Sequence, residues 1–371
     1  MEISIDRECF LQILAHTQGV VDKRHSMAVL TNVLLEADDG KLTVTATDLE
    51  VSLKQVGPAD VKEGGLAATS ARKLFEIVRE ASSETVTLKT AENQWVEVSY
   101  GRSVFKLVGI DPEEHPGMPA IGQNGGKTCS IELDAGDLAE VIRKTIFAVS
   151  LDDTRSNLAG VYLEKGIKKG QVRLVATDGH RLAMVDRKVK GQGPDKGVIL
   201  PKKGLAELAK LLPDETGNVT LTIGGNTVTA DLGGRIFNMR LIEGNFPDYH
   251  QVVPKETLKI ITAERDELLQ TMRRVSILSS ERARGIKLSL KEGALEIAAN
   301  NPDLGEARED IGIEYDGDEF EIGFNARYMV EVLGVLPEGS KIEIGLSDEL
   351  SPGVIRGEDR DYSYVVMPMR I

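Results

Sequence analysis

The sequence has little of several features that would point to a particular class of protein. Only 4% of its 371 residues are aromatic and one is tryptophan, so stacking on single-stranded bases is not expected as a main activity. No apolar stretch approaches the roughly 20 residues that cross a bilayer, and the start MEISIDRECF lacks the basic and apolar regions of a signal peptide. We therefore expect a cytoplasmic protein with no membrane partner.

Chemical motifs are equally scarce. The two cysteines, Cys9 and Cys129, are too few for a disulfide framework and lack the paired spacing of a zinc site. H-E-x-x-H, G-x-S-x-G, EF-hand and Cys/His motifs do not occur. The segment GQNGGKT (122–128) misses the phosphate-binding loop by one residue, because Ile121 stands where its first glycine belongs. We expect no metal and no cofactor, and interpret this segment as a linker.

Histidine offers one candidate for acid–base chemistry. His180 lies in ATDGHRLAMV, where strand alternation would put it on the same side as Asp178. Asp-Gly is typical of turns, however, and the sequence offers no nucleophile to act with Asp178 and His180. The corresponding segments TDLE and NNPD, found elsewhere in the chain, lack histidine. We interpret the segment as a turn and expect no catalytic residue.

Charge is unevenly distributed along a chain of 41% hydrophobic and 28% charged residues, the balance of a soluble globular protein. The net charge of −14 argues against a protein that coats itself in nucleic acid. By thirds, 1–126 carries −7, 127–253 carries +2 and 254–371 carries −9. An anionic ligand should favour the middle third.

An internal repeat organises the sequence. Three segments pair two strands across a turn and end in a small residue before Thr/Asn and Asp/Asn: NVLLEADDGKLTVTATD (32–48), GVYLEKGIKKGQVRLVATD (160–178) and GIKLSLKEGALEIAANN (285–301). Ala46 and Ala176 are 130 residues apart, and Ala176 and Ala299 are 123 apart. The chain therefore contains three copies of one unit.

Each unit has two helical patterns with apolar residues three and four positions apart. The first patterns cover 6–21, 134–150 and 264–279, with Phe10, Leu138 and Leu268 in register, and the second cover 70–80, 201–212 and 325–336. Alternating strand patterns follow: TVTLKT, NVTLTI and KIEIGL, then FKLVGI, FNMRLI and YVVMPM. We predict an α+β fold with two helices and about eight antiparallel strands per unit, in domains 1–125, 126–254 and 255–371.

Five segments carry a family resemblance across the whole chain: ARKLFEIVR (71–79), VATDGHRLA (175–183), GNFPDYHQVVP (244–254), ILSSERARGIKL (277–288) and YVVMPMRI (364–371). Together they resemble the bacterial DNA polymerase III β subunit, the sliding clamp. The resemblance implies a head-to-tail homodimeric ring that encircles duplex DNA without reading its sequence, tethers polymerases and catalyses nothing. It also implies partners that carry clamp-binding peptide motifs: the polymerase α subunit, the clamp loader δ subunit and other polymerases or repair proteins.

Helix dimensions agree with a dimer. At about 9 Å between axes, six lining helices give a circumference of about 54 Å, too tight for a duplex, whereas twelve give about 110 Å. After the helix bodies are subtracted, the bore is about 25 Å wide. Charges on outer sheets would then lie beyond the Debye length of about 8 Å from the DNA.

The resemblance implies three sets of site residues. Basic residues on the lining helices and loops would contact phosphates: Arg24, Arg72, Lys73, Arg79, Lys202, Lys203, Lys210 and Arg327, together with Arg143, Lys144, Arg273 and Arg274. A partner-peptide cleft would comprise Leu158, Thr177, Gly179, His180, Arg181, Leu182, Pro247, Val252, Val365, Val366, Met367, Pro368 and Met369. Edge strands would form the dimer interface, with Phe105 and Leu107 near Ile277 and Leu278, and with Lys73, Arg102 and Lys106 facing Glu306 and Glu309.

The sequence departs from some members of the family at the cleft. Ser156 and Asn157 stand where aromatic residues can occur, and His250-Gln251 replaces a more basic pair. Two alternatives to a replicative clamp remain open at this point: a clamp paralogue that serves repair, and a cytoplasmic hydrolase or transferase built on repeated α+β units. The absence of an acid–base–nucleophile constellation counts against the enzyme.

Overall fold

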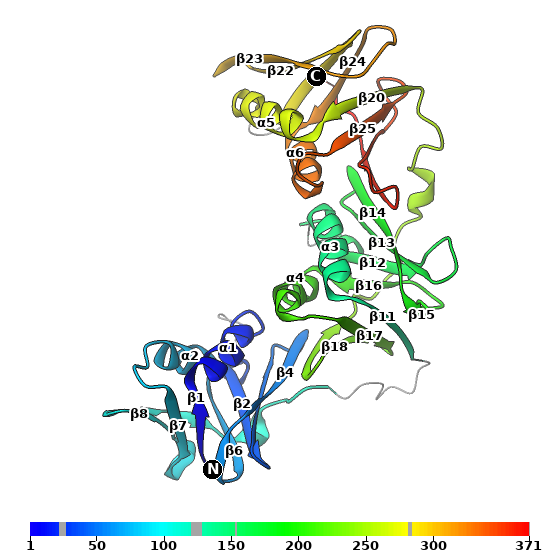
Figure 1. Cartoon of the computed structure of the whole chain (residues 1–371). Helices are drawn as coiled ribbons and strands as arrows, with labels where there is room; N and C mark the ends of the chain where they lie inside the picture. Colours follow the sequence, from blue (N-terminus) through cyan, green and yellow to red (C-terminus); the bar gives the residue numbers. More distant parts are fainter. Residues whose placement is uncertain (22–26, 120–127, 153, 281–283, 371) are drawn as a thin grey trace. The chain divides into compact units, whose positions relative to one another are not determined.

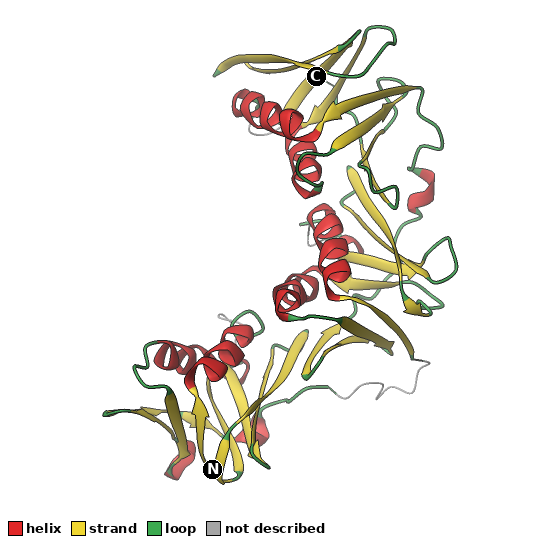
Figure 2. Cartoon of the chain, viewed as in Figure 1, coloured by secondary structure: helices red, strands yellow, loops and turns green. Residues whose placement is uncertain are grey.

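The structure is a computed structural model that describes residues 1–21, 27–119, 128–152, 154–280 and 284–370. Within these ranges the chain forms six α-helices and 27 strands (Figure 2). The first repeat contains β1 (Glu2–Asp6), α1 (Arg7–Thr17), β2 (Asn32–Asp38), β3 (Lys41–Thr47), β4 (Val51–Pro58), β5 (Asp60–Glu63), β6 (Gly65–Ser70), α2 (Ala71–Arg79), β7 (Thr85–Thr90), β8 (Val96–Tyr100), β9 (Ser103–Leu107) and β10 (Gly109–Ile110).

The same order of elements recurs twice. The middle repeat contains β11 (Cys129–Asp134), α3 (Ala135–Thr145), β12 (Gly160–Lys165), β13 (Gln171–Thr177), β14 (Arg181–Lys188), β15 (Lys190–Gly191), β16 (Val198–Pro201), α4 (Lys202–Leu211), β17 (Asn218–Gly224), β18 (Thr227–Leu232) and β19 (Arg235–Arg240). The third contains β20 (Lys259–Glu264), α5 (Arg265–Val275), β21 (Gly285–Lys291), β22 (Ala294–Asn301), β23 (Gly305–Gly312), β24 (Phe320–Asn325), α6 (Ala326–Val335), β25 (Lys341–Leu346), β26 (Gly353–Arg356) and β27 (Tyr362–Val366). The predicted α+β fold with two helices per repeat is confirmed.

The first helix of each repeat is shorter than predicted. α1 ends at Thr17, and after α3 and α5 the chain tightens into the 3₁₀ turns Ile146–Ala148 and Ser276–Leu278. The apolar pattern continues past the helix end into these turns, so periodicity alone places the helix end too late. A strand that the sequence patterns did not predict precedes each of these helices: β1, β11 and β20.

Helices and strands bury matching apolar faces. Phe10, Leu138 and Leu268, which the repeat places in register, are all at most 2% exposed. Each contributes about 2–3 kcal/mol of hydrophobic stabilisation. Figure 1 shows α1 and α2 side by side against the strands of the first repeat, and α5 and α6 side by side in the third. The first and third repeats therefore each present a pair of helices on one side of their strands.

Two sheets join neighbouring repeats. In the ten-stranded sheet β4 of the first repeat pairs antiparallel with β19 of the middle repeat, and in the eight-stranded sheet β14 of the middle repeat pairs with β27 of the third. The compact units follow these sheets: one holds Met1–Ala139, Val189–Pro194 and Leu200–Leu241, and the other holds Glu140–Lys188, Asp195–Ile199 and Ile242–Ile371. The middle repeat thus contributes its two halves to different units.

Strand register defines equivalent positions in the three repeats. Leu88, Leu221 and Ile344 pair with the equivalent residues Val98, Ala230 and Ile355 of the next strand. Those residues pair in turn with Phe105 on β9, Phe237 on β19 and Tyr364 on β27. β9, β19 and β27 are therefore the same strand of the repeat, and β4, β14 and β23 are another.

Candidate functional site

A pocket of about 260 Å³ lies beside the C-terminal strand, between β14, β27 and the segment that follows residue 246. We call it the tail pocket. Its lining is Leu158, Thr177, Gly179, His180, Arg181, Leu182, Pro247, Asp248, Tyr249, Val252, Val365 and Met367. Leu158, Leu182, Val365 and Tyr249 are buried and form a largely apolar wall. A cavity of this kind suits one or two apolar side chains of a short peptide.

The turn between β13 and β14 shapes one rim of the tail pocket. Thr177 Oγ1 donates to Arg181 O at 2.6 Å and accepts from Gly179 N at 3.1 Å, while Asp178 Oδ1 accepts from the backbone amides of His180 (2.9 Å) and Arg181 (3.1 Å). Gly179 has a φ of +89°, which disfavours any side chain, and a Cβ there would lie 3.2 Å from Arg155 Nη1. The rim is therefore fixed in shape without a ligand.

The Arg181 side chain stabilises the turn between β13 and β14. Its side chain is buried, donates to Asp178 Oδ2 (3.1 Å), to Glu331 and to the carbonyl of Phe147 (2.7 Å), and lies 4.4 Å from the ring centre of Tyr328. Because all these partners are internal, Arg181 positions the rim and supplies little free charge to a ligand.

Two backbone hydrogen bonds hold the C-terminal tail, residues 367–370, beside the tail pocket. Met367 N donates to His180 O at 2.9 Å, and Met369 N donates to Gly323 O at 2.8 Å, so the tail connects the β14 turn with β24. Ten of the predicted cleft residues line the pocket. Val366, Pro368 and Met369 are not among the lining residues. Val366 follows Val365 on β27, and neighbouring residues of a strand face opposite sides.

Asp248 and Tyr249 line the tail pocket but were missed from the sequence. The Tyr249 hydroxyl donates to Glu164, and burial together with this bond raises its pKa, so the group stays a neutral donor. Asp248 accepts a hydrogen bond from Gln251 Nε2 at 2.9 Å. Gln251 is one of the positions at which the sequence departs from some members of the family. Asn157 is a second such position, and its Nδ2 donates to Asn245 O at 2.9 Å. Asp248 and Tyr249 could be assigned to the tail pocket only from contacts that form when the chain folds.

Acid–base chemistry has no support at this site. The Asp178 carboxylate is engaged by two backbone amides and by Arg181. Among the residues that the structure describes, no group of three or more His, Cys, Asp or Glu side chains is placed to hold a metal ion. The same described ranges contain no helix long and apolar enough to span a membrane. The geometry fits binding.

The helices carry a positive charge that the rest of the chain lacks. They hold 13 basic and 8 acidic residues, a net charge of +5, although the whole chain carries −14. Most predicted phosphate contacts are paired with a nearby carboxylate: Arg72 and Lys73 with Glu76 (2.8 Å each), Arg79 with Glu80 (3.1 Å), Lys203 with Asp48, Lys210 with Glu207 (2.7 Å) and Arg327 with Glu331 (2.8 Å). The pairs of Arg72, Lys73 and Arg79 are solvent-exposed and therefore weak, so these cations can still meet an anion. Lys203 differs because the Asp48 carboxylate is buried. Arg24 lies outside the described residues.

Lys144 contradicts the prediction that it contacts phosphates. Its side chain is 1% exposed, with Nζ 2.6 Å from Glu140 Oε1 and 2.7 Å from Asp359 Oδ2. Arg187 Nη2 donates to the same two carboxylates at 2.7 and 3.1 Å. Helix periodicity could not show that Asp359, from the third repeat, closes over this position.

Replacing Lys144 by Ala should lower the stability of the protein by about 3 kcal/mol at pH 7, because two half-buried carboxylates then share one guanidinium. Burial acts to raise the pKa of Glu140 and of Asp359, but the hydrogen bonds and charges of Lys144 and Arg187 outweigh it and hold both pKa values below normal. This stabilisation is present at neutral pH and is lost as the pH falls through the lowered pKa values.

Thermal melts of wild type and Lys144→Ala at neutral and acidic pH measure this effect. The difference in melting temperature should shrink as the pH falls through the lowered pKa values of Glu140 and Asp359, because protonated carboxyls no longer need the Lys144 charge. Lys41→Ala, at an exposed position, is the control and should melt as wild type does. A constant difference at every pH would contradict the role of the network.

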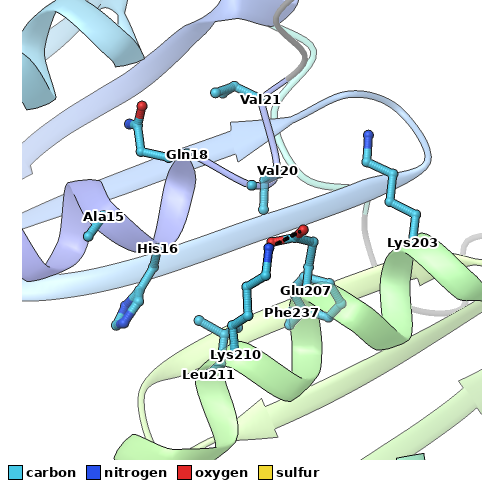
Figure 3. A pocket seen from close by; sticks show the side chains of 11 residues that line it. Ala15, His16, Gln18, Val20, Val21, Lys203, Glu207, Lys210, Leu211 and Phe237 are labelled. Carbon is cyan, nitrogen blue, oxygen red and sulfur yellow. Dashed lines mark hydrogen bonds and ion pairs between the residues drawn. The ribbon is translucent and has the colours of Figure 1, made fainter. Parts of the chain in front are cut away.

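A second hollow, of about 590 Å³, separates the end of α1 from α4 (Figure 3). It is lined by Ala15, His16, Gln18, Gly19, Val20, Val21, Lys203, Glu207, Lys210, Leu211 and Phe237. Gly19 is the thirteenth residue counted from the start of α1, and Phe147 and Ile277 hold the same position after α3 and α5. A Cβ on Gly19 would lie 1.8 Å from Glu207 Oε2, so the glycine lets α4 approach and leaves the hollow unfilled.

Two strand edges whose equivalents are paired inside the chain, those of β9 and β23, have no partner strand in the described structure. β9 ends the five-stranded sheet β5-β1-β7-β8-β9, and β23 ends the four-stranded sheet β23-β22-β21-β24. β9 exposes Val104 (58%) and Phe105 (37%), whereas Phe237 and Tyr364, equivalent to Phe105, are fully buried. An exposed apolar edge favours pairing with another strand.

Comparison with known proteins covers the chain from end to end. Family models of the DNA polymerase III beta subunit match its N-terminal domain at residues 1–119, its central domain at 132–248 and its C-terminal domain at 250–370. The beta sliding clamps of Pseudomonas aeruginosa and Haemophilus influenzae are 38% and 37% identical to the chain, with 100% of both sequences covered in each case. A solved P. aeruginosa sliding clamp bound to griselimycin is 37% identical, covers 100% of both chains and has a TM-score of 0.93. The chain therefore belongs to the family of DNA polymerase III β subunits, the sliding clamps.

Proposed function

We propose that two copies of the chain close head to tail around duplex DNA by pairing β9 of each copy with β23 of the other. The family provides DNA polymerase III with its processivity clamp, so the chain serves DNA replication as a non-catalytic, DNA-binding subunit. The observation that carries the proposed interface is the repeat itself. β4 pairs with β19, and β14 pairs with β27; the equivalent third pair is β23 with β9. Its two strands lie at opposite ends of one chain, so a second copy must supply the partner edge.

The register of the proposed pair follows from the two pairs inside the chain. Phe237 lies opposite Leu53 and Tyr364 opposite Ala183. Leu53 and Ala183 pair with Ala46 and Ala176, just as Ala307 pairs with Ala299. Phe105 should therefore lie opposite the partner's Ala307. In an antiparallel pair this places Lys106 opposite Glu306 and Leu107 opposite Gly305.

Cross-strand chemistry supports this register. Lys106 and Glu306 are exposed and of opposite charge, which stabilises a pair of facing residues. Ile277, at the position of Gly19 and Phe147, is 73% exposed, and Leu278 beside it is half-buried, so both are available to pack near Phe105. Glu309 already accepts from Arg274 at 2.5–3.0 Å within its own chain, so any approach of Arg102 would add to an existing pair.

The helix faces are proposed as the surface that meets DNA. Their net charge of +5 stands against −19 for the remaining residues of the chain. Arg72 and Lys210 expose more than 60% of their side chains, so they can exchange a carboxylate for a phosphate at little cost. Such contacts are independent of sequence because they involve only the phosphate backbone.

We place the clamp-binding peptides of the polymerase α subunit, the clamp loader δ subunit, other polymerases and repair proteins in the tail pocket. Support comes from its apolar walls, its preformed rim and the adaptable Met367 side chain. We infer domain limits at 1–125, 126–254 and 255–371 and a cytoplasmic location. The family matches support three domains, although the third match begins at residue 250.

The ring is tested by retention on DNA. After loading onto closed circular DNA, the protein should resist a rise in salt, and it should leave once the circle is cut, because a topological link does not depend on counterions. A protein held by six or more phosphate contacts alone would lose about a thousandfold in affinity between about 50 and 200 mM salt. Gel filtration of the loaded DNA at both salt concentrations, before and after cutting, measures this. Salt-sensitive loss from the intact circle, unchanged by cutting, would refute encirclement.

A further inference from the structure

The three repeats differ in charge at one end of their strands. In each repeat a hairpin tip joins the first two strands of a meander, and a second connecting segment follows its third strand. We call both the outer loops, although the second includes the short strand β5 in the first repeat and β15 in the middle repeat. These outer loops comprise 38–41 and 58–64, 165–170 and 188–197, and 291–293 and 312–319. Their net charges are −2, +5 and −4. Since the repeats share one fold, the positive charge of the middle repeat is not required by the architecture.

Five lysines of the middle repeat gather at this end in one compact unit: Lys165, Lys168, Lys169, Lys188 and Lys196, all of them exposed. We call them the lysine patch. Gly166 N donates to Gln171 O at 2.8 Å and Gln171 lies opposite Lys188, which joins the tip to β14. Lys165 Nζ lies 2.6 Å from Asp195, which joins the tip to the second loop.

An aliphatic side chain projects from the middle of the lysine patch. Ile167 is 79% exposed and is flanked on its C-terminal side by Lys168 and Lys169. The tips of the other two repeats, Asp39-Gly40 and Glu292-Gly293, are two-residue turns without an apolar residue. The longer tip of the middle repeat therefore presents an apolar side chain beside exposed lysines.

This chemistry favours a protein segment over a nucleic acid. The outer loops of the middle repeat contain no aromatic residue on which bases could stack, and a phosphate backbone offers nothing apolar to Ile167. The tip lies at the far end of β13 from Thr177 and the tail pocket, and the strands β12 and β13 lead away from α3 (Figure 1). A ligand there would leave the tail pocket and the helix faces free.

We propose that the lysine patch is a second docking surface, for an acidic protein segment that carries an apolar residue among its carboxylates. Lysines are mobile point charges that accept a range of carboxylate geometries, and Ile167 selects segments with an apolar centre. A protein bound through the tail pocket gains affinity if such a segment reaches the patch as well, because the second contact is then intramolecular.

The test uses the full-length protein and a fluorescent 12-residue peptide of Asp and Glu with a central Leu. We expect Lys168→Glu/Lys169→Glu to weaken its binding at least tenfold at low salt and Ile167→Ser at least threefold. The control Lys41→Glu/Lys291→Glu makes the same change in net charge at exposed positions on the tips of the other repeats and should stay within twofold of wild type. Anisotropy titrations measure all four proteins.

Several results would overturn the docking surface. Equal losses in the two double variants would show a non-specific charge effect, and unchanged binding by Ile167→Ser would remove the apolar contact. Loss of peptide binding in Met367→Ala would place the probe in the tail pocket. A 20-nucleotide single strand that binds more tightly than the peptide, and is lost in Lys168→Glu/Lys169→Glu, would make the patch a nucleic-acid site. Retention on circular DNA should be unchanged in every patch variant, so this test can fail without affecting the ring.

Discussion

Replacing Phe105 by Asp should convert the dimer into monomers and abolish retention on circular DNA. Phe105 is 37% exposed and stacks on Tyr100 with ring centres 5.7 Å apart, while its equivalents Phe237 and Tyr364 are fully buried at the two junctions inside the chain. Loss of such an aromatic anchor costs at least about 3 kcal/mol. A closed dimer has two seams, so the total is about 6 kcal/mol, more than a ten-thousandfold change in the dimer constant.

Light scattering over a range of micromolar concentrations measures this effect. Leu258→Asp is the matched control, because Leu258 is 81% exposed and lies outside the proposed interface. We expect the control to remain dimeric and the Phe105 variant to remain folded by circular dichroism. A dimeric Phe105→Asp protein, or a monomeric wild type, would show that β9 does not form the seam.

A charge exchange examines the register within the same seam. Lys106→Glu and Glu306→Lys should each weaken the dimer about tenfold, since each places like charges opposite one another at both seams. The double variant should recover most of the lost affinity because opposite charges face one another again. If the double variant is weaker than either single one, Lys106 and Glu306 do not lie opposite each other.

Replacing Met367 by Ala should weaken binding of a polymerase-derived clamp-binding peptide about thirtyfold without affecting the dimer. Met367 lines the tail pocket and is half-buried, and a well-packed anchor of a small pocket is worth about 2 kcal/mol. Deletion of residues 367–371 should have at least the same effect. The deletion also removes the bonds from Met367 N to His180 O and from Met369 N to Gly323 O, so it is expected to lower stability.

Peptide titration and light scattering on the same samples separate these effects. Met27→Ala, at a position 49% exposed and away from the tail pocket, is the control and should bind as wild type does. Undiminished peptide affinity in folded, dimeric Met367→Ala and in the deletion would mean that the tail only packs the core. Reduced affinity in both variants and in the control would indicate a general loss of structure.

Local patterns were sufficient to predict the repeat, the paired helices and the three hairpins. The apolar residues of α2, α4 and α6 recur every three or four positions. The segments around Ala46, Ala176 and Ala299 each pair two strands across a turn, with the alanine at the same point of the second strand. These features depend on residues close together in the chain, where backbone geometry restricts the choices. Ten of the thirteen cleft residues that the family resemblance predicted line the tail pocket. A resemblance identifies residue positions but not the contacts that those residues make in this chain.

The sequence by itself therefore determined which elements form, how many times they recur and which family they belong to. Only the tertiary structure decided that Lys144 is buried under Asp359, that Val365 faces the tail pocket while Val366 faces away, and that Asp248 and Tyr249 complete its wall. It also showed that β4 and β14 are joined to β19 and β27 within the chain, whereas β23 and β9 end their sheets in the described residues. Each of these outcomes depends on residues far apart in sequence, and periodicity carries no information about which distant side chain closes over a given position.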